Sequence, residues 1–102
     1  MLVKFNNSYL EKLYQDKVKG KTAYNKEVIT QFKKTVLKLE QADNTTQLRQ
    51  FRSLNFEALK GNKKGMYSVR VNRQYRLEFE IENDTITLSE IIIIDELSKH
   101  YE

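Results

Sequence analysis

The sequence predicts an α+β fold, in which an N-terminal helical hairpin packs on one face of a small twisted antiparallel sheet. Between residues 8 and 42, apolar residues recur every three or four positions, as they do along the buried face of a helix. From residue 66 onward they alternate with polar residues, which is typical of strands that bury one face. The 102 residues, 39% hydrophobic and 31% charged, suffice for one modest core, so we expect a single domain over residues 1–102.

Composition excludes several classes of protein. The chain contains no Cys, which excludes a disulfide framework and thiolate chemistry and fits a reducing compartment. No apolar run approaches the roughly 20 residues of a membrane span. The N-terminal residues contain no long apolar stretch of the kind found in signal peptides. We therefore expect a cytoplasmic protein.

Charge is distributed unevenly along the chain. The formal net charge is +4, yet the segment from Glu82 to Glu102 holds six acidic residues and a single Lys, so the rest of the chain is strongly basic. A basic body of this kind favours an anionic partner, with nucleic acid as the first candidate. The alternative is a solvated lysine-rich surface without a binding role.

Two helices are predicted in the N-terminal half. The run Ser8–Glu11 fits a capping box, with Ser8 as the N-cap of a first helix that ends near Gly20. Thr22 is placed to cap a second helix that runs to about Ala42. The two helices would form an antiparallel hairpin.

Two shorter elements flank these helices. The apolar run Leu2–Phe5 predicts an edge strand or first strand. After the polar break that follows the second helix, Thr45 or Thr46 is placed to cap a short third helical segment through Phe51.

The alternation after residue 66 predicts a β-hairpin and its register. A loop of three residues, 72–74, pairs Val69 with Leu77 and Arg70 with Arg76. A two-residue loop would instead pair Val69 with Arg76 and mix the apolar and polar faces. Because a slip of one residue moves every side chain to the other face, the three-residue loop is favoured.

The C-terminal region is predicted to add one strand and a short helix or tail. A tight turn at Asn83–Asp84 leads into a strand over Thr85–Ile94. The alternation changes phase near Ser89–Glu90, which indicates a bulge or a change of packing environment. Residues 95–102 are expected to form a terminal helix or tail, and the polar face of the sheet is expected to stay open.

The predicted register places two guanidinium groups opposite each other, since Arg70 faces Arg76. Like charges in such a pair destabilise a sheet by some tenths of a kcal/mol. The arrangement is tolerated where solvent screens the pair, with Glu78 and Glu80 as counter-ions, or where an anion lies between the two arginines.

The region Leu59–Phe79, LKGNKKGMYSVRVNRQYRLEF, resembles the core motif of the HigB branch of the RelE-type bacterial toxins. That pattern runs roughly L-K-G-x-x-x-G-x-[WY]-S-[VI]-x-V-N-x-x-[WY]-R-[LI]-x-F. The resemblance implies a RelE-like fold and a toxin of a type II toxin–antitoxin pair. It also implies cleavage of messenger RNA on the ribosome without a metal or other cofactor, and a small HigA-like helix-turn-helix antitoxin as partner.

Cleavage of RNA by its own 2′-hydroxyl needs removal of the 2′ proton, stabilisation of the phosphorane charge and protonation of the leaving 5′ oxygen. Arg76 and Arg70 are candidates for the second task, because a guanidinium stays charged and binds phosphate oxygens in a bidentate way. The resemblance places Lys60 in the L-K-G motif, where it adds charge or transfers a proton. Glu57 stands where many relatives have His, so it either replaces that acid–base group or leaves it missing.

The end of the chain offers two alternatives for a further acid–base group. Many relatives end the last strand in an acidic-aromatic-His run, in which Asp95 matches the acid and Leu97 replaces the His. Alternatively His100, the single His of the chain, folds back with Tyr101 and supplies the group. A lone terminal His is more often an ordinary surface residue. The expected RNA-binding residues are Lys63, Lys64, Arg73 and Ser68.

Two other functions compete with messenger-RNA cleavage. One is a ParE-like toxin of related fold that inhibits DNA gyrase by binding, and the other is a non-catalytic basic RNA-binding module. An aromatic platform for single-stranded RNA is not expected, because Tyr67, Tyr75 and Phe79 fall on the predicted buried face. A metal nuclease is disfavoured, because the basic face lacks clustered carboxylates.

Overall fold

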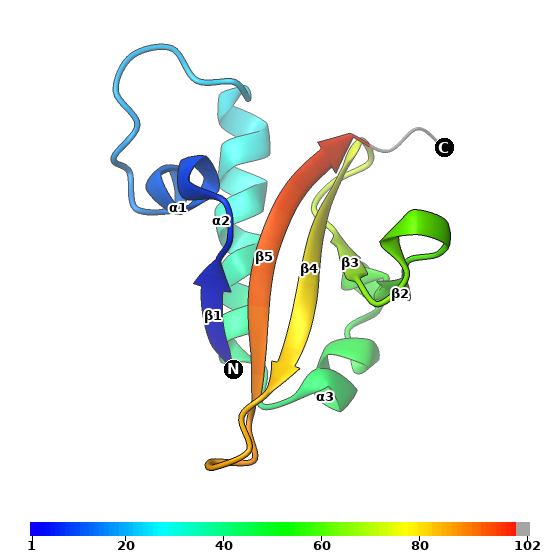
Figure 1. Cartoon of the computed structure of the whole chain (residues 1–102). Coiled ribbons are helices and arrows are strands. Elements are labelled where there is room, and N and C mark those ends of the chain that lie inside the picture. The colour runs from blue at the N-terminus through cyan, green and yellow to red at the C-terminus, as the bar shows by residue number, and fades with distance from the viewer. Residues whose placement is uncertain (100–102) are drawn as a thin grey trace.

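The computed structural model describes residues 1–99 as an α+β protein with a five-stranded sheet in the order β1-β5-β4-β3-β2 (Figure 1). This confirms the predicted α+β class. Among residues 1–99, no helix is both long and apolar enough to cross a membrane. The elements are β1 (Leu2–Phe5), α1 (Ser8–Tyr14), α2 (Lys26–Gln41), α3 (Thr45–Gln50), the 3-10 turn η1 (Arg52–Leu54), β2 (Glu57–Ala58), the 3-10 turn η2 (Gly61–Lys63), β3 (Tyr67–Arg70), β4 (Tyr75–Asn83) and β5 (Glu90–Lys99).

The sheet is mixed, so the expectation of a wholly antiparallel sheet is wrong at one edge. β1 pairs with β5 in parallel, with Leu2 opposite Ile91 and Phe5 opposite Ile94, while the remaining neighbours are antiparallel. A parallel pair needs a long connection between its strands. Here the three helices and the other three strands lie between β1 and β5 in the chain.

The predicted register of the β3–β4 hairpin is confirmed. Val69 lies opposite Leu77 and Arg70 lies opposite Arg76. Asn72 fixes the turn between the strands, because its side-chain Oδ1 accepts the backbone N–H groups of Gln74 and Tyr75, both at 2.8 Å. An Asn side chain that bonds to the backbone two or three residues further on is a common way to stabilise such a turn.

The predicted boundaries of the last strand are wrong. Residues 84–89 form the turn, in which the Asp84 carboxylate accepts N–H groups of Ile86 and Thr87. β5 continues to Lys99, where a short helix or tail was expected. The reason is a bulge at Asp95: Phe79 pairs with Ile94, but Glu78 pairs with Glu96. One inserted residue shifts the alternation, so the second half of β5 does not read as a strand in the sequence. Residues 100–102 of the expected terminal helix or tail lie outside the described residues.

The long antiparallel helical hairpin is not confirmed. α1 ends at Tyr14, where Asp16 takes a left-handed conformation with φ of 59°, and residues 15–25 form an irregular connection to α2. Val18, which fits the helical period of the sequence, packs against the core from this connection. The helical spacing of Val18 in the sequence therefore indicates that this residue is partly buried, although it does not lie in a helix.

All three helices begin after an asparagine. The side chains of Asn7, Asn25 and Asn44 accept the N–H groups of Leu10, Val28 and Gln47, respectively. The predicted caps Ser8, Thr22 and Thr45 or Thr46 are wrong by one to three residues. Asn caps a helix about as well as Ser and better than Thr, so the residue types alone did not decide between neighbouring candidates.

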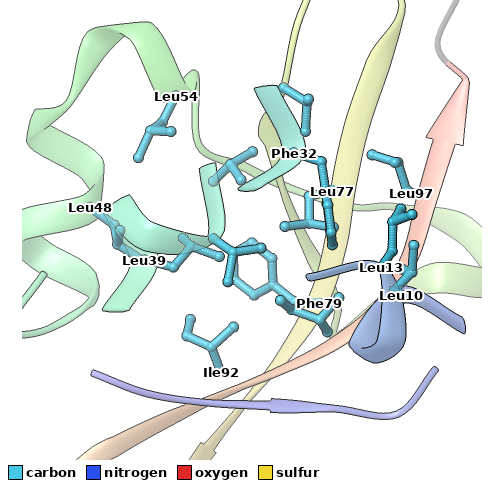
Figure 2. Close-up of a cluster of buried hydrophobic side chains, with 14 of the residues drawn as sticks. Leu10, Leu13, Phe32, Leu39, Leu48, Leu54, Leu77, Phe79, Ile92 and Leu97 are labelled. Atoms are coloured by element: carbon cyan, nitrogen blue, oxygen red, sulfur yellow. The ribbon is translucent and has the colours of Figure 1, made fainter. Parts of the chain in front are cut away.

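The core lies between α2 and the inner face of β3, β4 and β5, with α1 and α3 at its two ends (Figure 2). Phe32 of α2 and Phe79 of β4 are fully buried within it. Each side chain of this size contributes about 1.5–3 kcal/mol when it is buried. The contacts of Phe32 and Phe79 hold α2 against the sheet, and β4 also carries Arg76 on its opposite face.

We predict that Asn25→Ala lowers the free energy of unfolding by about 0.5–2 kcal/mol, because α2 loses its N-terminal cap. Asn25→Asp should retain most of the stability, since a carboxylate accepts the same bond. Chemical denaturation of the three proteins tests this. Unchanged stability of Asn25→Ala, together with a large loss in Thr22→Ala, would show that Thr22 is the functional cap after all.

Candidate functional site

The polar face of the sheet is covered over β3 and the start of β4, so the expectation of an open face is wrong there. The segment 51–63 lies along the β3 edge of the sheet, where β2 pairs with β3 (Figure 1). From this segment Asn55 and Lys63 bond to Arg76 and Glu78 on the polar face. As a result three polar side chains are buried on it, with exposed fractions of 0% for Ser68, 7% for Arg76 and 6% for Glu78. Buried polar groups require partners, and their partners define the site.

Arg76 is held by hydrogen bonds to the segments on either side of it. Its Nε donates to Ser68 Oγ at 2.9 Å, and its Nη2 donates to the carbonyl oxygen of Asn55 at 2.6 Å and to that of Ser68 at 3.4 Å. Asn55 adopts a left-handed conformation with φ of 44°, which Asn tolerates better than most residues. The guanidinium therefore has a fixed position, and an Arg keeps its charge at any physiological pH.

Glu57 supplies negative charge beside this arginine. Its carboxylate lies 3.8 Å from Arg76 Nη2 and accepts a bond of 3.3 Å from Asn55 Nδ2. The backbone of Glu57 is paired with Ser68 in the two-residue strand β2. The Glu57 side chain is half exposed, so it can move without breaking the strand.

Glu78, the next polar residue of β4 on this face, is paired with Lys63. The two side chains are 2.7 Å apart, and Glu96 of β5 lies 3.6 Å from the same ammonium. The hydrogen bond that Lys63 donates to Glu78, with the charges of both carboxylates, raises the pKa of Lys63 above its ordinary value of 10.5, against a smaller opposing effect of burial. Lys63, an expected RNA-binding residue, is thus engaged within the protein. Ser68, another, is buried and bonded to Arg76.

The other basic residues predicted for the site lie in β3 or in the segments before and after it. Lys60 and Lys64 are exposed at the two ends of η2, and Arg73 is exposed at the β3–β4 turn. Arg70 faces Arg76 in the sheet, but its Nε donates to the carbonyl oxygen of Asn72 at 3.3 Å. The two guanidinium groups therefore bond to different segments.

The structure describes only some of the C-terminal candidates for an acid–base group. His100 lies outside the described residues. Asp95 occupies the bulge of β5, where its Oδ1 accepts a bond of 3.1 Å from Asn6, and Leu97 is buried in the core. Within residues 1–99 there is no group of three or more His, Cys, Asp or Glu residues that could hold a metal ion.

Sequence reasoning missed Asn55, whose main-chain oxygen makes the shortest of these bonds to Arg76. A carbonyl oxygen is present in every residue, so nothing in the residue types marks this one. The pairing of Lys63 with Glu78 was equally hidden, because it joins residues 15 positions apart.

The fold and site together define a small α+β protein that holds a buried, hydrogen-bonded arginine on one face of its sheet. The chain matches the family described as the RelE-like toxin of type II toxin–antitoxin system HigB over residues 3–91, and it belongs to that family. It is 35% identical over 80 residues to Toxin HigB-1 of Vibrio cholerae serotype O1 (strain ATCC 39315 / El Tor Inaba N16961), a match that covers 78% of this chain and 83% of that protein. The resemblance noted in the sequence is thereby confirmed.

Two solved structures are similar in fold. The YoeB/ParE toxin from Agrobacterium tumefaciens superposes with a TM-score of 0.59 at 13% identity, covering 99% of this chain and 100% of that one. The YoeB-YefM complex from Staphylococcus aureus gives a TM-score of 0.54 at 20% identity, with 99% of each chain covered. At these identities the likeness concerns the fold alone.

We predict that Lys63→Ala lowers the free energy of unfolding by about 1–3 kcal/mol, because the buried Glu78 carboxylate loses its ion pair. Lys64→Ala removes the same charge from an exposed neighbour and should change stability by less than about 0.5 kcal/mol. Since the pKa of Lys63 is raised by folding, its contribution is complete below pH 10.5 and is lost as the pH rises through the folded-state value. Equal effects of the two substitutions in urea denaturation at pH 7 would contradict the assigned pairing.

Proposed function

We propose that this toxin is an endoribonuclease that cleaves messenger RNA on the ribosome, by attack of the RNA's own 2′-hydroxyl and without a metal. The observation that carries the proposal is Arg76, a permanent positive charge fixed on a rigid sheet by Ser68 and Asn55. Membership of the RelE-like toxins, which are generally endoribonucleases, supports it. A charge held in place before reaction stabilises a transition state without the cost of reorganisation.

In this reaction the 2′ oxygen forms a bond to phosphorus while the bond from phosphorus to the 5′ oxygen breaks. A base takes the 2′ proton, and an acid gives a proton to the departing 5′ oxygen. The products are a 2′,3′-cyclic phosphate and a 5′-hydroxyl. We assign stabilisation of the phosphorane to Arg76 with Arg70 beside it, proton removal to Glu57, and proton donation to Lys60, with His100 as a further candidate acid.

The contacts of Arg76 suggest how substrate engages it. The Glu57 carboxylate lies 3.8 Å from Arg76 Nη2, and the Glu57 side chain is half exposed. A phosphate that approaches Arg76 would replace this carboxylate as counter-ion and leave Glu57 available as a base. With few acid–base groups on the protein, we propose that the ribosome positions the RNA.

We further propose that a small HigA-like helix-turn-helix antitoxin binds and neutralises this toxin in the cytoplasm, where translation takes place. Membership of a toxin–antitoxin family supports an antitoxin partner. One of the similar solved structures is likewise a complex, of YoeB with YefM.

We predict that Arg76→Ala reduces the rate of messenger-RNA cleavage on programmed ribosomes by about 10²–10³, the usual loss for one preorganised donor. Arg76→Lys should restore the rate only in part, since an ammonium lacks the bidentate fork. Arg73→Ala, at the exposed turn, should lose far less. Because Arg76 is buried with hydrogen-bonded partners, its replacement by Ala should also cost about 1–3 kcal/mol of stability. Rates are therefore measured well below the unfolding temperature of each variant.

The same assay includes naked RNA without ribosomes, which we expect the protein to cleave poorly. Native rates in folded Arg76→Ala would remove Arg76 from the reaction, and efficient cleavage of naked RNA would contradict dependence on the ribosome. If the wild-type toxin leaves messenger RNA intact and blocks DNA supercoiling, it acts as a ParE-like gyrase inhibitor.

A further inference from the structure

A basic cleft lies between the first two turns of α2 and the β3–β4 turn. Its volume is about 630 Å³, within the range of small-molecule sites. Figure 1 shows the start of α2 and the β3–β4 turn at the same end of the molecule, where β5 finishes. The lining residues are Lys26, Glu27, Thr30, Gln31, Arg70, Val71, Asn72 and Arg73.

Three cations face this cleft and a single carboxylate offsets them. Within residues 1–99, Lys26, Arg70 and Arg73 take part in no ion pair, in contrast to Lys63 and Lys33, which are paired with Glu78 and Asp16. Unpaired cations that converge on one cleft attract an anion, and the planar guanidinium groups suit phosphate oxygens in particular.

The walls of the cleft are rigid. Asn72 holds the turn through its bonds to the N–H groups of Gln74 and Tyr75, and the same residue's carbonyl oxygen accepts from Arg70 Nε. On the opposite wall, Asn25 caps α2 and so fixes its first turn. Because these bonds hold the backbone of both walls and the side chain of Arg70, less ordering of the protein is needed on binding.

Side chains that can recognise a base line the helical wall of the cleft. Glu27 accepts hydrogen bonds, Thr30 both donates and accepts, and the Gln31 amide does both at once. Such groups read the edge of an unpaired nucleobase, whereas phosphate contacts alone carry no sequence information. The cleft thus combines a site for phosphate with a site for a base.

We propose that this cleft binds one nucleotide of single-stranded RNA next to the phosphate at Arg76, with Lys26, Arg70 and Arg73 on its phosphate and Glu27 and Gln31 on its base. Arg70 links the two places, because it lines the cleft and faces Arg76 across the β3–β4 pair. The inference rests on the proposed function in one respect: the RNA molecule in the cleft must be the same one whose phosphate meets Arg76. It makes the helical wall of the cleft a determinant of base preference.

The test is an NMR titration of the isotope-labelled protein with 2′-O-methylated RNA hexanucleotides, one for each base, which bind but cannot be cleaved. Backbone signals of residues 26–31 and 70–73 should shift. Lys26→Ala and Arg73→Ala should each weaken binding about tenfold and lower the slope of log affinity against log salt by about 0.7. Lys38→Ala, about 18 Å further along α2, is the control with the same loss of charge and should do neither.

Gln31→Ala tests the base-reading part, since it should reduce the difference in affinity between the best-bound and worst-bound hexanucleotides. An unchanged difference would overturn that part, and variants at Lys26 and Arg73 that behave as Lys38→Ala would overturn the cleft as a whole. A different result would refute the proposed function alone. In that case RNA would still shift the NMR signals of the cleft residues, but the wild-type protein would leave ribosome-bound messenger RNA uncut.

Discussion

The hydrogen bonds that hold Arg76 beside the segment 51–63 are the constraint on which the rest of the site depends. Ser68 provides two of the acceptors from the neighbouring strand, and Asn55 provides a third from that segment. These bonds join β3, β4 and the loop before β2 into one unit. Glu57 and Lys60 follow directly from that loop, so the position of Arg76 and the placement of the candidate proton-transfer groups are coupled.

The core makes this arrangement rigid from the other side of the sheet. Leu77, which follows Arg76 in β4, is fully buried on the helical face (Figure 2). Because successive side chains of a strand point to opposite faces, burial of Leu77 fixes the direction of Arg76. The same packing of α2 on the sheet brings the first turns of the helix next to the β3–β4 turn, where the basic cleft forms. The same strand register therefore determines the packing of the core, the direction of Arg76 and the position of the cleft.

The register of the β3–β4 pair was predictable from sequence, but the β5 bulge and the bonds around Arg76 were not. Clean alternation and a three-residue turn predicted the pairing of Arg70 with Arg76, and the motif around Tyr67 and Arg76 predicted the family. The second half of β5 was not predicted, because the residue inserted at the Asp95 bulge breaks the two-residue period of the sequence. The bond from Arg76 to Asn55 uses a main-chain oxygen, which no side-chain pattern can reveal.

The central claim is that Arg76 meets the scissile phosphate. Its most direct test is a cryo-electron microscopy structure of the toxin on a ribosome programmed with messenger RNA that is 2′-O-methylated at the cleaved codon. We expect a phosphate within hydrogen-bond distance of the Arg76 guanidinium and the Glu57 carboxylate displaced from its place beside Arg76. A phosphate bound elsewhere, with Arg76 still enclosed by Glu57, Asn55 and Ser68, would contradict the account.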